Sequence, residues 1–473
     1  MSVLSHLSPQ RVFYYFEQLC AIPHSSENME AIAAYCVDFA KKQGLRHLRD
    51  KANNVIIYKD AAPGYEQAAP LLLQGHLDMV CQKTPNSTVD FLKDGLDLYV
   101  EGDFVKARGT TLGADNGIAV AMVLAILEDQ SLPHPALEAV FTTDEEIGMI
   151  GATQLDFSNL SARKMINLDA EEEDSVTVSC AGGSDFQLHL PVEQTPCTGT
   201  PVTVTLQGLL GGHSGVEIHK GRINAALLGA PLVQLPGAEL MDYHSGDKAN
   251  AIPNQCRARL CVTRPQLFEP ALAAFLAGLE TDKEREKGLT HRVEYGAPGR
   301  YEVFTPQTRQ SLFSALVTPP DGVVAMSTAI PGLVETSLNL GIVAADGEGI
   351  LLHRALRSNK EGALTALEDQ LKGMFPAEWI QTFGRYPSWE FKEDSALQGL
   401  YKEIYRNQTG TQPKVEAIHA GLECGVFAAG LPGLDCIAIG PQLYDVHTVN
   451  ERLSISSLGR IYNILLELLK ASR

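Results

Sequence analysis

Positive charge is scarce in this sequence: Lys and Arg together number 38 against 57 Asp and Glu, a formal net charge of −19. Nucleic acids and anionic membrane surfaces both select for a basic face, so this balance argues against either as a partner. No apolar run reaches the length of a membrane-spanning helix. The opening residues, MSVLSHLSPQRVFYYFEQL, lack the basic region and apolar core of a signal peptide. We therefore expect a soluble, cytoplasmic protein.

Cysteines are few and scattered, and none of the nine belongs to a C-x-x-C pair. An odd number without framework spacing is typical of reduced thiols in the cytoplasm. Nucleotide-binding signatures are missing too, because there is no P-loop and the glycines of GLLGGHSG do not form G-x-G-x-x-G. Cys180 has no nearby base in the sequence, which argues against a cysteine hydrolase. A chain of 473 residues with 45% hydrophobic residues remains, typical of a globular protein with two or more domains.

Strands and helices alternate in the first part of the chain. Apolar runs with strand character are NNVIIYK, PLLLQGHLDMV, LEAVFTTDEE and RKMINLDAEEE, and residues 116–129, NGIAVAMVLAILED, are strongly helical. This alternation predicts an α/β domain in which helices flank a mainly parallel sheet. In such sheets, ligands bind beyond the carboxyl ends of the strands.

The pattern changes near Thr198. PVTVTLQGL and QCRARLCVTRP alternate like half-exposed strands, and GRINAALLGAPLVQL between them is helical in character. The segments RYPSWEF, GLDCIAIG and SISSLGRIYNILLELLKAS then return to the α/β pattern. We predict a catalytic domain split between residues 1–186 and 385–473, with an α+β lid and dimerisation domain inserted at residues 187–384.

Acids and histidines cluster where the predicted strands end. The strand AVFTT runs directly into three acids, and such a group is costly to bury unless a cation lies beside it. Two imidazoles with several carboxylates form a zinc-type ligand set, and carboxylates can bridge two ions. Taken singly, each residue is more often structural: Asp115 could cap its helix, and AEEE could be a solvated loop. The set that converges is His76, Asp78, Asp115, Glu145, Glu146, Asp169 and His447.

The order of these motifs resembles a known family. GHLDMV, GADNG, TTDEEIGM, NLD and VHTVNE occur as in the dinuclear zinc exopeptidases related to carboxypeptidase G and aminoacylase, and GHLDMVCQK with IHAGLECG is most similar to cytosolic aminoacyl-histidine dipeptidases. The resemblance implies two divalent ions per subunit, Zn²⁺ by preference with Mn²⁺ or Co²⁺ also suitable. Asp115 would bridge them; His76 with Asp169 and Glu146 with His447 would complete the two sites. Glu145 would be the general base, Asp78 would orient His76, and Asp144 would face solvent or cap backbone.

The same resemblance assigns residues to substrate. LLGGHSGVEIHKGRINA is similar to the lid segment whose histidine reaches over the active site, commonly from the partner subunit of a dimer; His213 fits that position better than His219. On resemblance, Asn250 would contact the substrate carboxylate, and Arg357 is a chemically sensible clamp for the same group. His419 and Glu423 would belong to the substrate pocket, with Glu423 on the free amine. Without the metal motifs, GGHSG would be a flexible glycine turn and Arg357 a solvated arginine.

The sequence thus predicts a homodimeric metallo-dipeptidase that cleaves small Xaa-His peptides of the carnosine type by a two-metal-activated water. Hydrolysis by bound metals follows from the residues, whereas the preference for histidine follows from resemblance alone. A tripeptidase or an N-acyl amino acid deacylase of the same fold is the alternative. A second alternative is a binding protein without catalytic turnover, which would be expected only if a metal ligand or the general base were missing.

Overall fold

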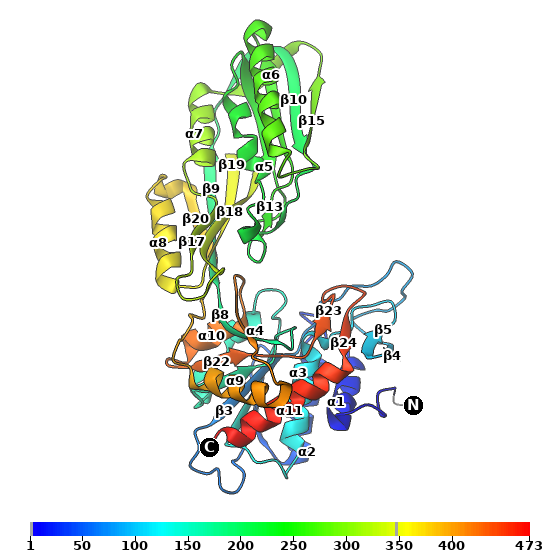
Figure 1. The fold of residues 1–473 in the computed structure, drawn as a ribbon. Coiled ribbons are helices and arrows are strands. Elements are labelled where there is room, and N and C mark those ends of the chain that lie inside the picture. The colour runs from blue at the N-terminus through cyan, green and yellow to red at the C-terminus, as the bar shows by residue number, and fades with distance from the viewer. Residues whose placement is uncertain (1–2, 346–348) are drawn as a thin grey trace. The chain divides into compact units, whose positions relative to one another are not determined.

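The computed structural model describes residues 3–345 and 349–473, which form two compact units (Figure 1). The first unit contains the chain up to Cys180 together with residues 391–417 and 422–473, and the second contains residues 181–390 and 418–421. The second unit therefore extends six residues beyond the predicted insertion at each end. It also includes a four-residue segment that the sequence did not indicate.

An eight-stranded sheet organises the first unit, in the order β1-β2-β6-β3-β7-β22-β8-β21. The neighbours β6, β3, β7 and β22 are parallel, as predicted, whereas the pairs β1–β2, β2–β6 and β22–β8 are antiparallel. The parallel strands are buried along their length because helices cover such sheets on both faces. The strands are β1 (Arg46–Arg49), β2 (Val55–Lys59), β3 (Leu71–His76), β6 (Leu137–Thr142), β7 (Lys164–Asn167), β8 (Ser175–Cys180), β21 (Lys414–Ile418) and β22 (Asp435–Ala438).

Helices and a small sheet complete the first unit. The helix α3 is apolar on every side and buried over most of its length, as expected of a helix packed inside a domain. The small sheet has the order β23-β24-β5-β4. The helices are α1 (Gln10–Cys20), α2 (Glu30–Gln43), α3 (Ala114–Glu128), α4 (Ile150–Gln154), α9 (Ala396–Thr409), α10 (Glu423–Gly430) and α11 (Ile455–Ala471), and the small-sheet strands are β4 (Leu98–Glu101), β5 (Phe104–Ala107), β23 (Leu443–Tyr444) and β24 (Arg452–Ser454).

The second unit contains a ten-stranded sheet with antiparallel pairing, whose main path is β15-β10-β14-β12-β18-β19-β9-β20. The helices α6 and α7 lie along this sheet (Figure 1), and side chains such as Leu260, Phe268 and Leu312 form the core between them. The ten strands of this sheet are β9 (Gly182–Pro191), β10 (Gln194–Gln207), β12 (Ala238–Ser245), β14 (Cys256–Val262), β15 (Thr290–Tyr295), β16 (Gly299–Phe304), β17 (Gly322–Met326), β18 (Val334–Ala345), β19 (Gly349–Ser358) and β20 (Ile380–Tyr386). A separate two-stranded sheet contains β11 (Gly212–His213) and β13 (Ala251–Ile252). The helices are α5 (Ala225–Leu228), α6 (Pro265–Asp282), α7 (Pro306–Val317) and α8 (Glu361–Lys372).

Two predicted elements differ from the structure. The predicted helix GRINAALLGAPLVQL is broken into α5 and the 3-10 turn η3 (Ala230–Gln234), because Gly229 and Pro231 interrupt it. The predicted strand RYPSWEF is wrong for most of its length, since β20 ends at Tyr386, directly before a proline. Within the described residues, no helix combines the length and apolar character needed to cross a membrane.

Candidate metal centre

Adjacent parallel strands bring the predicted residues to one edge of the first unit's sheet. His76 is the last residue of β3, Glu145 and Glu146 follow the end of β6, and Asp169 follows the end of β7. The strand β3 lies between β6 and β7, and His76 is paired directly with Thr142. These side chains therefore lie at one edge of the sheet, as their positions after successive strands predict.

Asp115 lies between two imidazoles. Its Oδ1 is 3.2 Å from Nε2 of His76, and its Oδ2 is 3.0 Å from Nε2 of His447. Residue 115 lies inside α3 by hydrogen bonding, but its φ of −80° and ψ of 102° are not helical. Each oxygen of this carboxylate thus faces a different histidine, which is the arrangement that a bridging ligand requires.

Each imidazole also faces a second carboxylate. Nε2 of His76 is 3.4 Å from Oδ1 of Asp169, and Nε2 of His447 is 3.0 Å from Oε1 of Glu146. His76, Asp115 and Glu146 offer ligand atoms that all lie within 4.8 Å of one another. These groups form two sets of nitrogen and oxygen donors that share Asp115, and a divalent cation is the ligand that suits such donors.

Asp78 holds the backbone of the acidic loop. Its Oδ1 accepts a hydrogen bond from the backbone N–H of Glu145 (3.0 Å), and its Oδ2 accepts one from that of Glu146 (3.2 Å) and one from Oγ of Ser26 (2.8 Å). The predicted contact with His76 takes a different form. Nδ1 of His76 is 3.0 Å from the main-chain oxygen of Asp78 and 3.4 Å from its carboxylate. The main chain at residue 78 is therefore the nearer partner of the imidazole.

Asp144, the first acid of the loop, caps backbone. Its Oδ1 accepts a hydrogen bond from the backbone N–H of Glu27 at 2.6 Å, and its own φ is 53°. Of the two expectations for this residue, backbone capping is the one that the structure shows. The three consecutive acids thus have separate environments, which reduces the repulsion among them.

Charge and burial shift the pKa values of these groups strongly. The carboxylates of Asp115 and Glu146 raise the pKa of His447 to about 11. Burial opposes protonation of His76, but Asp169, Asp115 and Asp78 outweigh it and raise the pKa of that imidazole well above its ordinary value. Burial raises the pKa of Glu145 well above the usual range of a carboxyl, against the opposing influence of His76. Strong shifts from burial and specific charges are concentrated at functional sites.

In the second unit, His213 and Arg357 lie close together. A side chain on Gly215 would meet the main-chain oxygen of His419, Cε1 of His213 at 3.0 Å and Nε of Arg357 at 3.2 Å, so the glycine occupies the small space among them. Nδ1 of His213 accepts hydrogen bonds from the backbone N–H groups of Gly215 (3.1 Å) and Val216 (3.2 Å). A neutral imidazole that accepts at Nδ1 carries its proton on Nε2, so His213 is a donor there.

Arg357 and Asn250 retain polar atoms for a ligand. Arg357 donates from Nη1 to the hydroxyl of Tyr386 (2.8 Å), while its Nε is buried without a hydrogen-bond partner. Asn250 is exposed, its main-chain oxygen accepts from the N–H of Ser214 (2.9 Å), and its neighbour Ala251 pairs with His213. The structure therefore brings these three predicted residues into one region of the second unit.

His419 and Glu423, four positions apart in the chain, belong to different units. Nε2 of His419 is 2.7 Å from Oγ of Ser337, and its Nδ1 is 3.0 Å from Oδ1 of Asn359, so both ring nitrogens have protein partners. Glu423 is fully buried, and its Oε2 accepts from Nε2 of Gln74 (2.5 Å) and from the hydroxyl of Thr142 (2.7 Å). The other oxygen of Glu423, Oε1, is buried without a hydrogen-bond partner, so the contact of this residue with a substrate amine stays a prediction.

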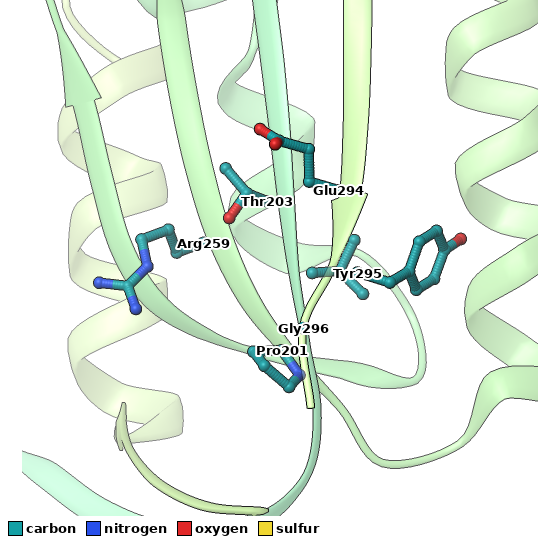
Figure 2. A pocket seen from close by; sticks show the side chains of 7 residues that line it. Pro201, Thr203, Arg259, Glu294, Tyr295 and Gly296 are labelled. Carbon is teal, nitrogen blue, oxygen red and sulfur yellow. The ribbon is translucent and has the colours of Figure 1, made fainter. Parts of the chain in front are cut away.

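A surface hollow of about 280 Å³ also lies in the second unit, lined by residues of β10, β14 and β15 (Figure 2). Thr203, Arg259 and Glu294 line it, and Thr203 is paired with each of the other two across the sheet. None of the predicted site residues is among those that line it. The donor set at the end of β3, β6 and β7 is therefore the better candidate for chemistry.

Comparison with known proteins agrees with that geometry. Residues 72–471 match the model of peptidase family M20/M25/M40. The cytosol non-specific dipeptidase of Escherichia coli (strain K12) is 37% identical over 482 residues, covering 99% of both chains. The chain belongs to this peptidase family.

Solved structures of two relatives show the same fold. Aminoacylhistidine dipeptidase from Vibrio alginolyticus matches with a TM-score of 0.91 and 33% identity, covering 99% of this chain and 98% of that one. Aminopeptidase PepT from Bacillus cereus matches with a TM-score of 0.57 at 13% identity, covering 98% and 99%, a likeness of fold alone. The predicted fold class and the predicted enzyme class, a peptide hydrolase, are both confirmed.

Asn116 has a place in this peptidase that the sequence reasoning missed. Its side-chain oxygen accepts from the backbone N–H of His76 (3.2 Å), and its Nδ2 donates to the main-chain oxygen of Leu168 (3.0 Å), one residue before Asp169. One amide next to Asp115 thereby connects two strand ends that carry ligand groups. The only available signal was its position inside the motif GADNG.

Glu423 acquires a role in the same peptidase as part of a buried hydrogen-bond chain. Its carboxylate accepts a hydrogen bond from Nε2 of Gln74. Oε1 of Gln74 accepts one from Nδ2 of Asn167 (2.5 Å), and Oδ1 of Asn167 accepts one from the backbone N–H of Asp169 (3.1 Å). Burial raises the pKa of Glu423 to about 7. The hydrogen bonds of Glu423 Oε2 and of Gln74 connect β3, β6 and β7, while Oε1 of Glu423 is buried without a hydrogen-bond partner.

Proposed function

We propose that this peptidase is a dipeptidase that uses two divalent metal ions, with a preference for dipeptides that end in histidine. The observation that supports this most strongly is the position of Asp115, with one oxygen facing the His76 set and the other the His447 set. The alternative without turnover is disfavoured because no ligand or base is missing and the family is one of peptidases.

The donor spacing fits zinc. Two ligand atoms that each lie about 2.0–2.1 Å from a tetrahedral ion are roughly 3.3 Å from each other. The separations are 3.2 and 3.4 Å from His76 Nε2 to Asp115 and Asp169, and 3.0 Å from His447 Nε2 to both Asp115 and Glu146. We infer that His76, Asp115 and Asp169 hold one ion and that His447, Asp115 and Glu146 hold the other. Zn²⁺ is our proposal, and Mn²⁺ and Co²⁺ suit the same donors.

Glu145 is the proposed general base. Bound ions of this kind act as Lewis acids on a carbonyl oxygen and bring the pKa of water close to neutrality. Burial raises the pKa of Glu145, so its carboxylate is a stronger proton acceptor than a solvated one. The hydrogen bond from its backbone N–H to Asp78 fixes the position of the Glu145 backbone, from which the side chain extends. Glu145 would take the proton of the attacking water and then deliver it to the leaving amine.

The second unit would bind the substrate. Nε2–H of His213 is the proposed donor to the oxyanion, in its own or the partner subunit, because its Nδ1 is already an acceptor. Burial and the charge of Arg357 lower the pKa of His213, which keeps the ring neutral near pH 7. The unpartnered Nε of Arg357 and the exposed amide of Asn250 would bind the substrate carboxylate. We retain His419 as a residue that shapes the same region through Ser337 and Asn359.

The relatives' names support the substrate class. One is named a non-specific dipeptidase of the cytosol and the other an aminoacylhistidine dipeptidase. We propose accordingly that this chain acts on Xaa-His dipeptides in the cytoplasm, as a homodimer formed through the second unit. The nine cysteines, which form no disulfide among the described residues, agree with a reducing compartment.

The test is release of histidine from β-alanyl-histidine and alanyl-histidine before chelation, after chelation and after return of Zn²⁺ or Mn²⁺. We expect activity that disappears with the chelator and returns with the metal, together with two ions per chain by elemental analysis. Alanyl-alanine, a tripeptide and an N-acetyl amino acid are the comparison substrates. Metal-dependent hydrolysis of the last two alone would replace the dipeptidase proposal by a tripeptidase or deacylase. A metal-loaded protein that hydrolyses none of them would overturn the proposal.

A further inference from the structure

Glu451 makes an unusual set of contacts. It is 3% exposed and directly precedes β24, four residues after His447. Its Oε2 accepts from the backbone N–H groups of Leu112 (2.7 Å) and Gly113 (3.1 Å), and its Oε1 accepts from those of Ala114 (2.8 Å) and Asp115 (3.3 Å). One carboxylate therefore binds four consecutive N–H groups from a segment more than 300 positions away.

The four N–H groups belong to the chain that enters α3. The first N–H groups of a helix have no partner within the helix and need an acceptor from elsewhere. Gly113, at the N-cap, has a φ of 68° and no side chain to provide one. Successive N–H groups that converge on one anion in this way form a nest, and Glu451 fills it from outside the helix.

This contact bears on Asp115 because the helix does not determine that residue's conformation. The φ and ψ of Asp115 are not helical, so helical hydrogen bonding alone does not fix the direction of its carboxylate. The bond from its own N–H to Glu451 and the bonds from the three residues before it hold the backbone in place. The orientation of the proposed bridging carboxylate thus depends on a residue outside both ligand sets.

The other end of the contact is tied to His447. Glu451 donates its own backbone N–H to the main-chain oxygen of Thr448 (3.1 Å), and the Thr448 hydroxyl donates to the main-chain oxygen of Asp445 (2.7 Å). His447 lies within this loop with a φ of 62°. The same residue therefore connects the backbone that carries His447 with the backbone that carries Asp115.

We propose that Glu451 is a positioning residue of the metal centre, which sets the separation between the Asp115 carboxylate and the His447 imidazole by binding the backbone of Leu112–Asp115. The proposal rests on the metal site inferred above. Replacement by Gln leaves one oxygen and places an NH₂ group against two of the four N–H donors, so the segment must shift. Groups that orient metal ligands typically change metal affinity by about 10- to 100-fold when they are mutated.

A matched control separates positioning from stability. Glu138, 6% exposed in the same unit, accepts from the backbone N–H groups of Ser161 and Ala162, and it lies near the start of β6 rather than at its carboxyl end. Glu138→Gln should therefore reproduce the loss of a buried backbone acceptor without disturbing the ligands. Glu451→Asp keeps both oxygens on a shorter side chain and serves as the milder variant if Glu451→Gln does not fold.

The experiment measures the Zn²⁺ dissociation constants by chelator competition, the visible absorption of the Co²⁺-loaded proteins and the melting temperatures of the metal-free proteins. We expect Glu451→Gln to weaken Zn²⁺ binding about 10- to 100-fold and to alter the Co²⁺ spectrum, and Glu451→Asp to do the same to a smaller extent. Glu138→Gln should lower the melting temperature with Zn²⁺ affinity unchanged.

Wild-type affinity and an unchanged spectrum in the folded Glu451 variants would overturn the proposal and leave the metal site standing. A wild-type protein that binds no divalent ion would instead overturn the metal site itself, and the role of Glu451 with it.

Discussion

Replacing Asp78 with Asn tests how the acidic loop is held. The side chain of Asp78 is fully buried, and its two oxygens accept from the backbone N–H groups of Glu145 and Glu146 and from the hydroxyl of Ser26. An amide is nearly the same size but has only one oxygen. In either orientation, its NH₂ group faces one of the two backbone donors.

The magnitude follows from that count. One buried backbone N–H without an acceptor costs about 1–3 kcal/mol. If this cost raises the free energy of the transition state, kcat/KM falls roughly 5- to 150-fold, at about 1.4 kcal/mol for each factor of ten. His76 should be spared, because its Nδ1 has the main-chain oxygen of residue 78 at 3.0 Å, which the substitution keeps. We therefore expect kcat/KM to fall by that factor, with Glu145 and Glu146 displaced and His76 retained.

The assay combines hydrolysis of alanyl-histidine, metal content per chain and urea unfolding of the metal-free protein. Ser26→Ala is the matched control because it removes one donor to Asp78 and leaves both backbone contacts intact. One hydrogen bond is worth about 1 kcal/mol, so this variant should change kcat/KM by less than about fivefold. Wild-type kcat/KM in Asp78→Asn, or complete loss of both ions, would refute the reasoning. The first result would mean that the backbone contacts are dispensable, and the second that His76 depends on the carboxylate after all.

Three further predictions concern the base, the pH dependence and the second unit. Glu145→Gln should lower kcat by about 10²- to 10⁴-fold with metal content unchanged, because general base catalysis contributes that much; a variant that loses its metal would instead make Glu145 a ligand. Because Asp115 and Glu146 raise the pKa of His447 to about 11, its protonation stabilises the metal-free protein fully below about pH 6.5 and progressively less towards pH 11. As the pH rises through this range, the urea unfolding midpoint of the metal-free wild type should fall, and that of metal-free His447→Asn should fall less. Zn²⁺ affinity of the wild type should rise over the same range. Equal dependence of the midpoint on pH in the two proteins would contradict this. Gly215→Ala places a methyl group against the main-chain oxygen of His419 and close to Cε1 of His213 and Nε of Arg357, so the backbone here must shift. Because small misplacements can cost up to about 100-fold, we expect kcat/KM for alanyl-histidine to drop about 10- to 100-fold with metal affinity unchanged. Unchanged kcat/KM would remove this region from substrate binding.

The sequence was sufficient for the parts of the site that depend on strand order. His76, Glu146 and Asp169 follow three runs that could be recognised as buried strands, and the carboxyl ends of adjacent parallel strands must meet at one edge. The contacts of Asp115 could not be predicted from strand order, because its non-helical backbone is held by a contact with Glu451, which is distant in the sequence. Local signals predict which residues are near an edge, but not which of their oxygens faces which neighbour.

Glu423 shows where motif reasoning fails. The segment IHAGLECG predicts one substrate pocket for both residues, yet His419 belongs to the second unit and Glu423 lies at the start of α10 in the first. Two residues four positions apart thus serve different structures, because the chain passes from one unit to the other between them. The fully buried carboxylate of Glu423 contacts side chains of β3 and β6, so it can organise these strand ends.

The three acids at the end of β6 are stabilised by different contacts. Asp144 accepts a hydrogen bond from a backbone N–H, and Glu146 faces the imidazole of His447, whose pKa it helps to raise. In the metal-free protein, the neighbouring carboxylates raise the pKa values of the His76 and His447 imidazoles, which favours their protonated forms beside this cluster. A metal ion must displace their protons to bind, because only a neutral imidazole is a ligand. Metal binding should then release protons in numbers that calorimetry in buffers of different ionisation enthalpy can count, and binding without proton release would mean that these two imidazoles are not the ligands.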